Sequence, residues 1–205
     1  MWWRVIKLSV LVCGIPERLP RDRRFKDEPT CVLNDLIDQS DDKPVEVLYL
    51  LDNLKMSVGR KRNILLSIAQ GEYVAYCDDD DEVAPDYVAT LLDAIGRNHG
   101  VDVIVFGQDC IRGDRGGVTE SCQYGLAFEY ANGVNADGHM WWRGLPSHTM
   151  CWRTDLVQGI AFPDETFGED VAWCRLASAE AKTEVRLNKT LYTYRYNPKT
   201  SRTRG

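Results

Sequence analysis

The chain has 205 residues, of which 44% are hydrophobic and 27% are charged, and its formal net charge is −6. This composition is that of an ordinary globular protein, and the length suits one large domain better than two. The negative net charge argues against recruitment of nucleic acid or an anionic membrane by the field of the whole molecule. No stretch approaches the roughly 20 apolar residues of a membrane-spanning helix, so we expect no stable membrane insertion.

The seven cysteines are scattered singly, without a C-x-x-C pair. Several lie within apolar runs, where a free cysteine behaves as a small hydrophobic residue. An odd, unpaired set favours a reducing compartment and argues against a disulfide framework or a zinc site. We therefore expect a soluble, cytoplasmic protein.

The first half of the chain alternates strand and helix patterns. Near-continuous apolar runs predict buried strands at residues 4–13, 45–51, 73–77 and 101–106. The intervening segments CVLNDLIDQ, SVGRKRNILLSIAQG and APDYVATLLDAIGRN predict helices, and Pro85 in the third suits a first helical turn. Repeated strand–helix–strand units predict an α/β fold with a doubly wound, mostly parallel sheet flanked by helices.

The second half is less regular. A strand pair is expected around residues 118–130, and TEVRLNKTLYTYRY has strand character. GEDVAWCRLASAEA predicts a helix whose inward face carries Trp173, Leu176, Ala177 and Ala181. We find no repeat, low-complexity tract or linker, and therefore predict a single domain over residues 1–205.

Polar residues follow three of the predicted strands, at the edge where a doubly wound sheet binds ligands. Gly14 and Ile15 follow the first strand, Asp52 ends the second, and residues 78–82 (DDDDE) follow the third. Adjacent carboxylates about 6 Å apart repel by under ~1 kcal/mol in water, and by several times more at a lower effective dielectric. A bound Mg²⁺ or Mn²⁺ ion offsets this repulsion, since hard cations take carboxylate oxygens and bridge to substrate phosphates. Plain solvation or a helix N-terminus is the alternative.

The block SVGRKRNILLSIAQGEYVAYCDDDDEVAPDYVATLL resembles the core of inverting family-2 glycosyltransferases of the GT-A fold. FGEDVAWCRL resembles the family's Glu-Asp motif and helix, and LYTYRYNPKTS resembles its closing strand and loop. The resemblance implies a metal-dependent inverting glycosyltransferase that uses a nucleotide-diphosphate sugar, expected to be UDP-linked. Residues from about 1 to 106 then form the nucleotide-sugar half, and about 107 to 205 the acceptor and catalytic-base half.

Carried over residue by residue, the resemblance assigns the donor site. Asp80 is expected to hold Mn²⁺ or Mg²⁺ together with Asp78, which faces the nucleotide. Asp52 matches an aspartate that contacts base or ribose, with an exposed strand-end carboxylate as the alternative. The full set expected to bind the nucleotide sugar is Gly14, Ile15, Asp52, Arg60, Arg62, Asp78, Asp79, Arg195, Ser201 and Arg202.

Asp170 matches the general base in the Glu-Asp motif, with Glu169 orienting it or binding acceptor. Proton transfer by a positioned carboxylate typically contributes about 10²–10⁴-fold to the rate. A structural alternative remains open, because both carboxylates would also favour a helix N-terminus.

Three regions depart from the family pattern or leave their role open. After the first strand, CGIPER replaces the usual proline, small residue, tyrosine and asparagine, so stacking on the base by tyrosine is not expected. His148 and Trp142 are candidates for acceptor binding, although a lone histidine is more often structural and the tryptophan can simply pack. Arg195, Ser201 and Arg202 form either a loop that closes over the diphosphate or an unpaired basic tail.

The acceptor is expected to be a hydroxyl of a saccharide, a lipid-linked molecule, a protein or a small molecule. The basic stretches RLPRDRRFK and KTSRTR also permit a phosphate-rich acceptor, including modified nucleic acid. Two other functions are weighed: a sugar-nucleotide nucleotidyltransferase, for which GIPERLPRDRR is a poor triphosphate loop, and a non-catalytic sugar or nucleotide binder.

Overall fold

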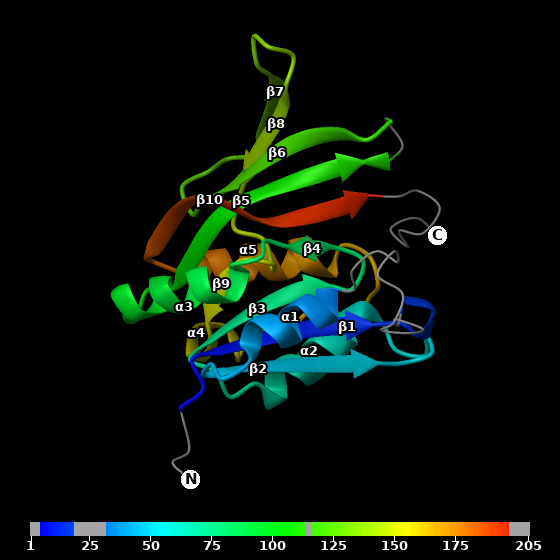
Figure 1. Ribbon diagram of the computed structural model, residues 1–205, viewed down its shortest axis with the longest axis vertical. Coiled ribbons are helices and arrows are strands. Elements are labelled where there is room, and N and C mark those ends of the chain that lie inside the picture. Colours follow the sequence, from blue (N-terminus) through cyan, green and yellow to red (C-terminus); the bar gives the residue numbers. More distant parts are fainter. Residues whose placement is uncertain (1–4, 19–31, 114–115, 197–205) are drawn as a thin grey trace.

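The computed structural model describes residues 5–18, 32–113 and 116–196, and these form a mixed α/β fold built on one large sheet (Figure 1). The strand order is β2-β1-β3-β9-β5-β6-β8-β7, and β10 pairs with both β5 and β4. Ser201 and Arg202 lie outside the described residues.

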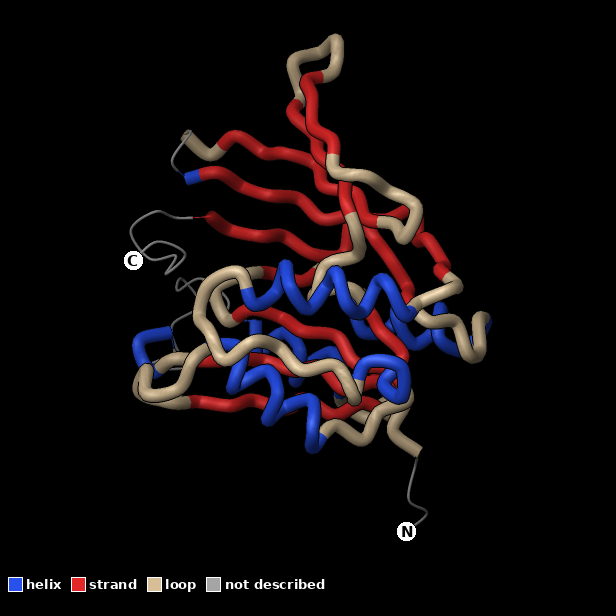
Figure 2. The backbone as a smooth tube through the Cα atoms, turned by 180° about the vertical axis from the view of Figure 1, so that it is seen from behind, coloured by secondary structure: helices blue, strands red, loops and turns tan. Residues whose placement is uncertain are grey.

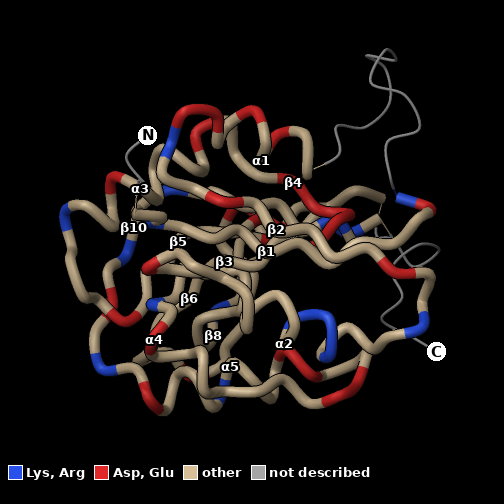
Figure 3. Tube along the Cα trace, turned by 90° about the horizontal axis from the view of Figure 1, so that it is seen from below, with Lys and Arg blue, Asp and Glu red and all other residues tan. Residues whose placement is uncertain are grey.

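The first part of the sheet consists of the three parallel strands predicted from the apolar runs. β1 (Leu8–Gly14) lies between β2 (Val45–Leu51) and β3 (Tyr73–Asp78). The helices α1 (Val32–Ser40) and α2 (Val58–Ile68) lie on opposite faces of these strands (Figure 3). Because all three strands run the same way, their carboxyl ends share one edge of the sheet.

The second part of the sheet begins with an antiparallel insertion. The short β9 (Cys151–Arg153) pairs antiparallel with both β3 and β5 (Val103–Arg112), so β5 runs in the direction of β3. β10 (Glu184–Tyr196) runs parallel to β5 and also pairs with the short β4 (Glu82–Val83). β4 begins at the last residue of the acidic run, which we define as residues 78–82.

Beyond β5, β6 (Val118–Tyr124), β8 (Met140–Gly144) and β7 (Ala131–Val134) extend the sheet into an arm that projects away from the helices (Figure 2). The sequence predicted a strand pair in this region, but β6 pairs with β5 and, in parallel, with β8.

Three further helices cover the sheet: α3 (Tyr87–Arg97), the short α4 (Thr154–Val157) and α5 (Glu169–Glu180). The N-cap of α3 is Asp86, so Pro85 lies before the cap and not in the first turn as predicted. On α5, Trp173 and Ala177 are buried, whereas Leu176 is 54% exposed, and its predicted inward position is wrong.

The core beneath the site is aromatic. The Trp173 and Phe162 rings stack with centroids 4.7 Å apart, and Trp152 and Tyr76 meet Trp173 edge to face. Six described cysteines are free and buried. No helix within the described ranges combines the length and apolar character that a membrane crossing needs.

The start of α2 depends on glycine at position 59. A Cβ there would lie 1.9 Å from the carbonyl oxygen of Pro163, and the Gly59 amide donates to the Glu165 carbonyl. We expect Gly59→Ala to lower the free energy of unfolding by about 1–3 kcal/mol because backbone must move.

The matched control is Gly96 on α3, where a Cβ would meet no atom within 4 Å. Gly96→Ala is expected to raise the free energy of unfolding by about 0.5–1 kcal/mol, since alanine favours the helix. Urea unfolding of both variants checks the pair, and equal effects would contradict the packing at Gly59.

Candidate active site

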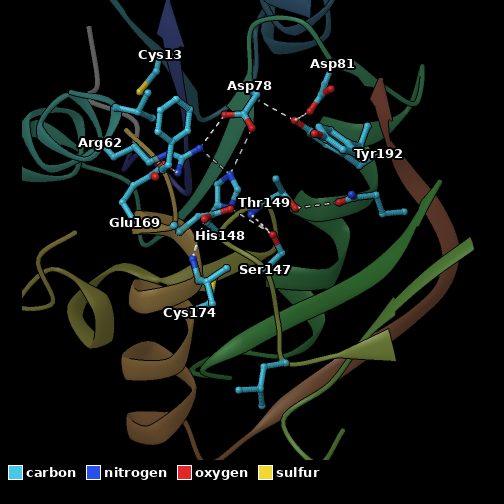
Figure 4. Close-up of a pocket in the computed structure, with 18 of the residues that line it drawn as sticks. Cys13, Arg62, Asp78, Asp81, Ser147, His148, Thr149, Glu169, Cys174 and Tyr192 are labelled. Carbon is cyan, nitrogen blue, oxygen red and sulfur yellow. Dashed lines mark hydrogen bonds and ion pairs between the residues drawn. The ribbon is translucent and has the colours of Figure 1, made fainter. Parts of the chain in front are cut away.

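A cavity of about 1320 Å³ opens at the carboxyl ends of β1 and β3 (Figure 4). Its lining includes the acidic run, the first turn of α5 and residues of β6 and β8. The predicted site residues that line it are Ile15, Arg62, Asp78, Asp79, Asp80, Trp142, His148, Glu169 and Asp170. The structure therefore brings both predicted base residues and part of the predicted donor set into one cavity.

The aspartates of the acidic run point to different partners. Asp78 Oδ1 accepts a hydrogen bond from Arg62 Nη2 at 2.9 Å. Asp79 accepts from the Ile15 amide at 3.0 Å and, like Asp80, is paired with the guanidinium of Arg18.

Asp81 is the innermost carboxylate of the run and is tied to β10. It accepts hydrogen bonds from the Tyr192 hydroxyl at 2.7 Å and the Arg195 amide at 2.9 Å. The Arg195 side chain instead pairs with Glu82, and it is not part of the cavity wall that the described residues form. Its predicted contact with the diphosphate stays a prediction.

Burial and mutual repulsion set the pKa values of the four aspartates. Burial would raise the pKa of Asp78, but the Arg62 charge and the His148 hydrogen bond hold it well below its usual range. Burial raises the pKa of Asp79, and that of Asp80 to about 6, although Arg18 opposes both shifts. Burial, and then the charge of Asp78, raise the pKa of Asp81 well above its usual value. The site therefore holds more carboxylate than its own cations neutralise.

Arg62 is the hub that joins the two sides of the cavity. Its Nη1 donates to Glu169 Oε1 at 2.7 Å, and its Nη2 lies 2.9 Å from both Asp78 Oδ1 and His148 Nε2. The guanidinium is 3% exposed and lies over the ring of Phe162. Arg62 thus positions the acidic run against α5, and its predicted contact with phosphate stays a prediction.

Glu169 and Asp170 lie next to one another but in different surroundings. Glu169 is buried against Arg62, and burial raises the pKa of its carboxyl although Arg62 opposes the shift. The Asp170 side chain is 39% exposed, with Oδ2 at 3.9 Å from His148 Nδ1 and Oδ1 accepting from the Val171 amide. Of the two, only Asp170 is free to approach a substrate hydroxyl.

The three basic residues of GRKRN have different surroundings in the structure. Arg60 is exposed and lies outside the cavity wall that the described residues form. Lys61 is buried; its Nζ lies 2.9 Å from Asp52 Oδ1 and 3.2 Å from the Gly14 carbonyl. Lys61, which lines the cavity, therefore joins Asp52 to Gly14, neither of which is part of the lining that the described residues form.

An aromatic wall faces the aspartates across the cavity. Trp142 on β8 is half-buried and meets the Tyr124 ring edge to face at 5.2 Å, with Tyr130 nearby at 6.5 Å. His148 lies between the acidic run and Asp170, within 3.5 Å of Asp78. Trp142 thus lines the cavity. His148 belongs to the network around Arg62 (Figure 4).

The sequence of the chain matches the family model of glycosyl transferase family 2 over residues 25–153. The chain belongs to this family. Comparison with curated protein sequences finds no match.

Solved structures of S. aureus TarS resemble this family member in fold. One TarS structure has a TM-score of 0.56 and 20% sequence identity, and the match covers 94% of this chain and 37% of the TarS chain. TarS 1–349 in complex with UDP-GlcNAc has a TM-score of 0.56 and 20% identity, and the match covers 93% of this chain and 59% of the TarS chain. TarS 1–349 in complex with UDP has a TM-score of 0.55 and 20% identity, and the match covers 94% of this chain and 61% of the TarS chain. The chain thus spans 37–61% of these TarS chains. The likeness confirms the GT-A-type fold predicted from the sequence.

The donor set at the acidic run fits the divalent cation that the family resemblance implies. Among the described residues no group of three His, Cys, Asp or Glu side chains forms a complete metal site. Mg²⁺, however, is commonly held by one or two carboxylates plus substrate phosphates. The Arg18 guanidinium already occupies a cation position between Asp79 and Asp80. Asp80 is the aspartate of this pair whose side chain stays 25% exposed.

The raised pKa of Asp80 predicts a pH-dependent stability. Its pKa of about 6 in the folded protein lies above the ordinary value of 3.8. The folded state therefore binds more protons between about pH 4 and 6, and the free energy of unfolding falls as pH rises through that window. Asp80→Asn in EDTA should remove this contribution and raise the free energy of unfolding at pH 7 by on the order of 1 kcal/mol, allowing for solvent screening.

Urea unfolding at pH 4 and pH 7 measures this effect, with the exposed Asp38→Asn as the matched control. A stability difference between Asp80→Asn and the wild type that is the same at both pH values would contradict it.

Arg18 and Tyr192 are site residues that the sequence analysis did not single out. Arg18 lies in the segment that departs from the family pattern, and that departure is the only sequence signal for it. Tyr192 lies within the predicted last strand, where its hydroxyl donates to Asp81 and accepts from the Asp78 amide. Nothing in the alternation of LYTYRY distinguishes this tyrosine from its neighbours.

Proposed function

We propose that this family-2 glycosyltransferase moves a sugar from a UDP-linked donor to an acceptor hydroxyl, with inversion at the anomeric carbon and with Mn²⁺ or Mg²⁺. The observation that carries the proposal is the placement of the acidic run and Asp170 on facing walls of one cavity, joined through Arg62 and His148. Membership in the family favours glycosyl transfer over nucleotidyl transfer.

The donor is proposed to lie along the ends of β1 and β3. The carboxylates there exceed the local cations, and Asp80, whose side chain is 25% exposed, would hold the metal together with Asp78. When bound, the metal supplies positive charge that stabilises the departing diphosphate. Asp78 is held by Arg62 and keeps the strand end in place beside it. UDP-GlcNAc and UDP in the TarS complexes support a UDP-linked donor here.

Asp170 is proposed to take the proton from the acceptor hydroxyl. As it does so, the hydroxyl oxygen forms a bond to the anomeric carbon, the bond from that carbon to the diphosphate oxygen breaks, and the nucleoside diphosphate leaves. Attack from the face opposite the leaving group inverts the configuration. Glu169 keeps its place by pairing with Arg62 and so fixes the first turn of α5, from which Asp170 projects.

The acceptor is proposed to enter between Asp170 and the aromatic wall at Trp142. A saccharide, lipid-linked, protein or small-molecule hydroxyl meets this requirement. Modified nucleic acid stays within the proposal because of the basic stretches RLPRDRRFK and KTSRTR, of which all but Arg18 lie outside the described residues. We place the reaction in the cytoplasm, in keeping with the free cysteines.

The experiment that tests the function incubates the protein with UDP-GlcNAc and other UDP-sugars, with Mn²⁺ or with EDTA. Proton NMR follows the released or transferred sugar. The proposal expects metal-dependent loss of an α-linked donor with initial formation of a β-configured product. An α-configured initial product would contradict inversion, and turnover in EDTA would contradict the role of the metal.

A further inference from the structure

Arg18 forms a clamp between the loop after β1 and the acidic run. It ends the short helix η1 (Pro16–Arg18), one turn beyond the strand. Its Nη1 lies 2.5 Å from Asp79 Oδ1, and its Nη2 lies 3.0 Å from Asp80 Oδ2. Asp79 is fixed from the other side by the amide of Ile15 at 3.0 Å. The guanidinium therefore lies on the carboxylate oxygens of the acidic run that the cavity makes available to a cation.

The two halves of the clamp differ in burial. The Asp79 side chain is 5% exposed, whereas the Asp80 side chain is 25% exposed. Burial strengthens a charge-assisted hydrogen bond and limits its exchange with water. The contact with Asp79 is thus the durable half of the clamp, and the contact with Asp80 is the half that a ligand in the cavity can displace.

A divalent cation and the Arg18 guanidinium compete for the same Asp80 oxygen. A metal ion bound there would lie close to Nη2, and two cations in a site of low dielectric repel. A bound diphosphate outweighs the repulsion between the metal and Arg18, because its oxygens attract both the metal and the planar guanidinium fork. Arg18 therefore opposes the metal alone and favours the metal together with a diphosphate.

We propose that Arg18 is a donor-binding residue that occupies the cation position on Asp80 in the free protein and turns onto the diphosphate when metal and nucleotide enter. The contact with Asp79 holds the arginine at the site during this exchange. This inference rests on the proposed function and adds an arginine at the segment where the chain departs from the family pattern. If the inference holds, the metal binds tightly only when the nucleotide is bound as well.

The test measures two affinities of Arg18→Gln. Electron paramagnetic resonance of free Mn²⁺ gives the affinity for Mn²⁺ alone, and calorimetry gives the affinity for UDP at saturating Mn²⁺. We expect Arg18→Gln to bind Mn²⁺ alone at least fivefold more tightly, and to bind UDP with Mn²⁺ at least tenfold more weakly. The matched control is Arg97→Gln, a change of the same kind at an exposed arginine of α3 paired only with Asp93 in the described contacts, and it should change neither value.

Opposite shifts in the two affinities distinguish this role from a purely structural clamp. If Arg18 only braces the loop, Arg18→Gln weakens both affinities or neither, and either result overturns the inference. Thermal unfolding checks that the variant folds. If Arg18→Gln does not fold, Arg18→Lys replaces it, because lysine keeps the charge but lacks the guanidinium fork. For Arg18→Lys we expect both affinities to shift in the same directions, each by about half as many log units.

The same data separate this inference from the proposed function. If the wild type and Arg18→Gln bind UDP with Mn²⁺ equally tightly, this inference is overturned and the proposed function is not. A wild type that binds no nucleoside diphosphate with Mn²⁺ overturns the proposed function and the second role of Arg18, while the Mn²⁺ measurement still decides the first role.

Discussion

Arg62→Met is expected to lower the free energy of unfolding by about 3–5 kcal/mol, because it leaves buried charge without its partner. Arg62 is 3% exposed and Glu169 is 4% exposed. The guanidinium donates to both Glu169 and Asp78, so its removal strands one fully buried and one partly buried carboxylate. Methionine matches much of the aliphatic stem, and the loss therefore reports mainly on charge.

Urea unfolding at pH 7 measures the effect, with Arg60→Met as the matched control. Arg60 is exposed and lies two residues before Arg62 on the same helix. Its replacement is expected to change the free energy of unfolding by less than about 0.5 kcal/mol. A second variant isolates the cause: adding Glu169→Gln to Arg62→Met should restore part of the loss. A change under 1 kcal/mol for Arg62→Met, or no restoration in the double variant, would show that Arg62 does not hold the two walls together.

Asp170→Asn is expected to lower kcat for transfer by about 10²–10⁴-fold, the usual contribution of general-base catalysis. The amide has nearly the shape of the carboxylate but cannot accept the proton of the acceptor hydroxyl. The Asp170 side chain is 39% exposed and is not part of the buried pair between Arg62 and Glu169. Nucleotide binding and stability should therefore change little.

Steady-state kinetics with a UDP-sugar donor, together with calorimetry of UDP binding, separates the two effects. Asp155→Asn, a change at a 72% exposed carboxylate on α4, is the matched control and should leave kcat unaltered. If Asp170 only favours the helix N-terminus, the variant loses a few tenths of a kcal/mol of stability and keeps its activity. Retained transfer would assign the base to another group.

The fold was predictable where burial dictates the pattern. The runs at β1 and β3 are apolar because both faces of these strands are covered, and the acidic run follows the carboxyl end of β3. The run at β2 is equally apolar, although β2 is an edge strand and only partly buried. The arm was less predictable: β7 and β8 are short and partly exposed, and β8 pairs in parallel with β6 as well as antiparallel with β7. The predicted inward positions on α5 were partly wrong: Trp173, Ala177 and Ala181 are buried, but Leu176 is exposed.

The candidate site was predictable as a set of strand ends but not as a set of contacts. Position along the chain placed Asp78, Arg62 and Asp170 at the site, yet it did not show that Lys61 turns inward as well and that Arg60 does not. Arg62 and Lys61 are buried and Arg60 is not, because the first turn of α2 packs against the ends of β1 and β2. Arg18 was missed because its partners lie about 60 residues away and no local pattern marks the pairing.

The measurement that tests the central claim most directly is calorimetric titration of the wild type with UDP, GDP, CDP and TDP, each with Mn²⁺ and with EDTA. Our account predicts binding of UDP that requires Mn²⁺, and binding at least tenfold weaker for the other nucleotides. Failure of every nucleotide to bind with Mn²⁺ would contradict the assignment of the acidic run to donor binding and leave its carboxylates with a structural role alone.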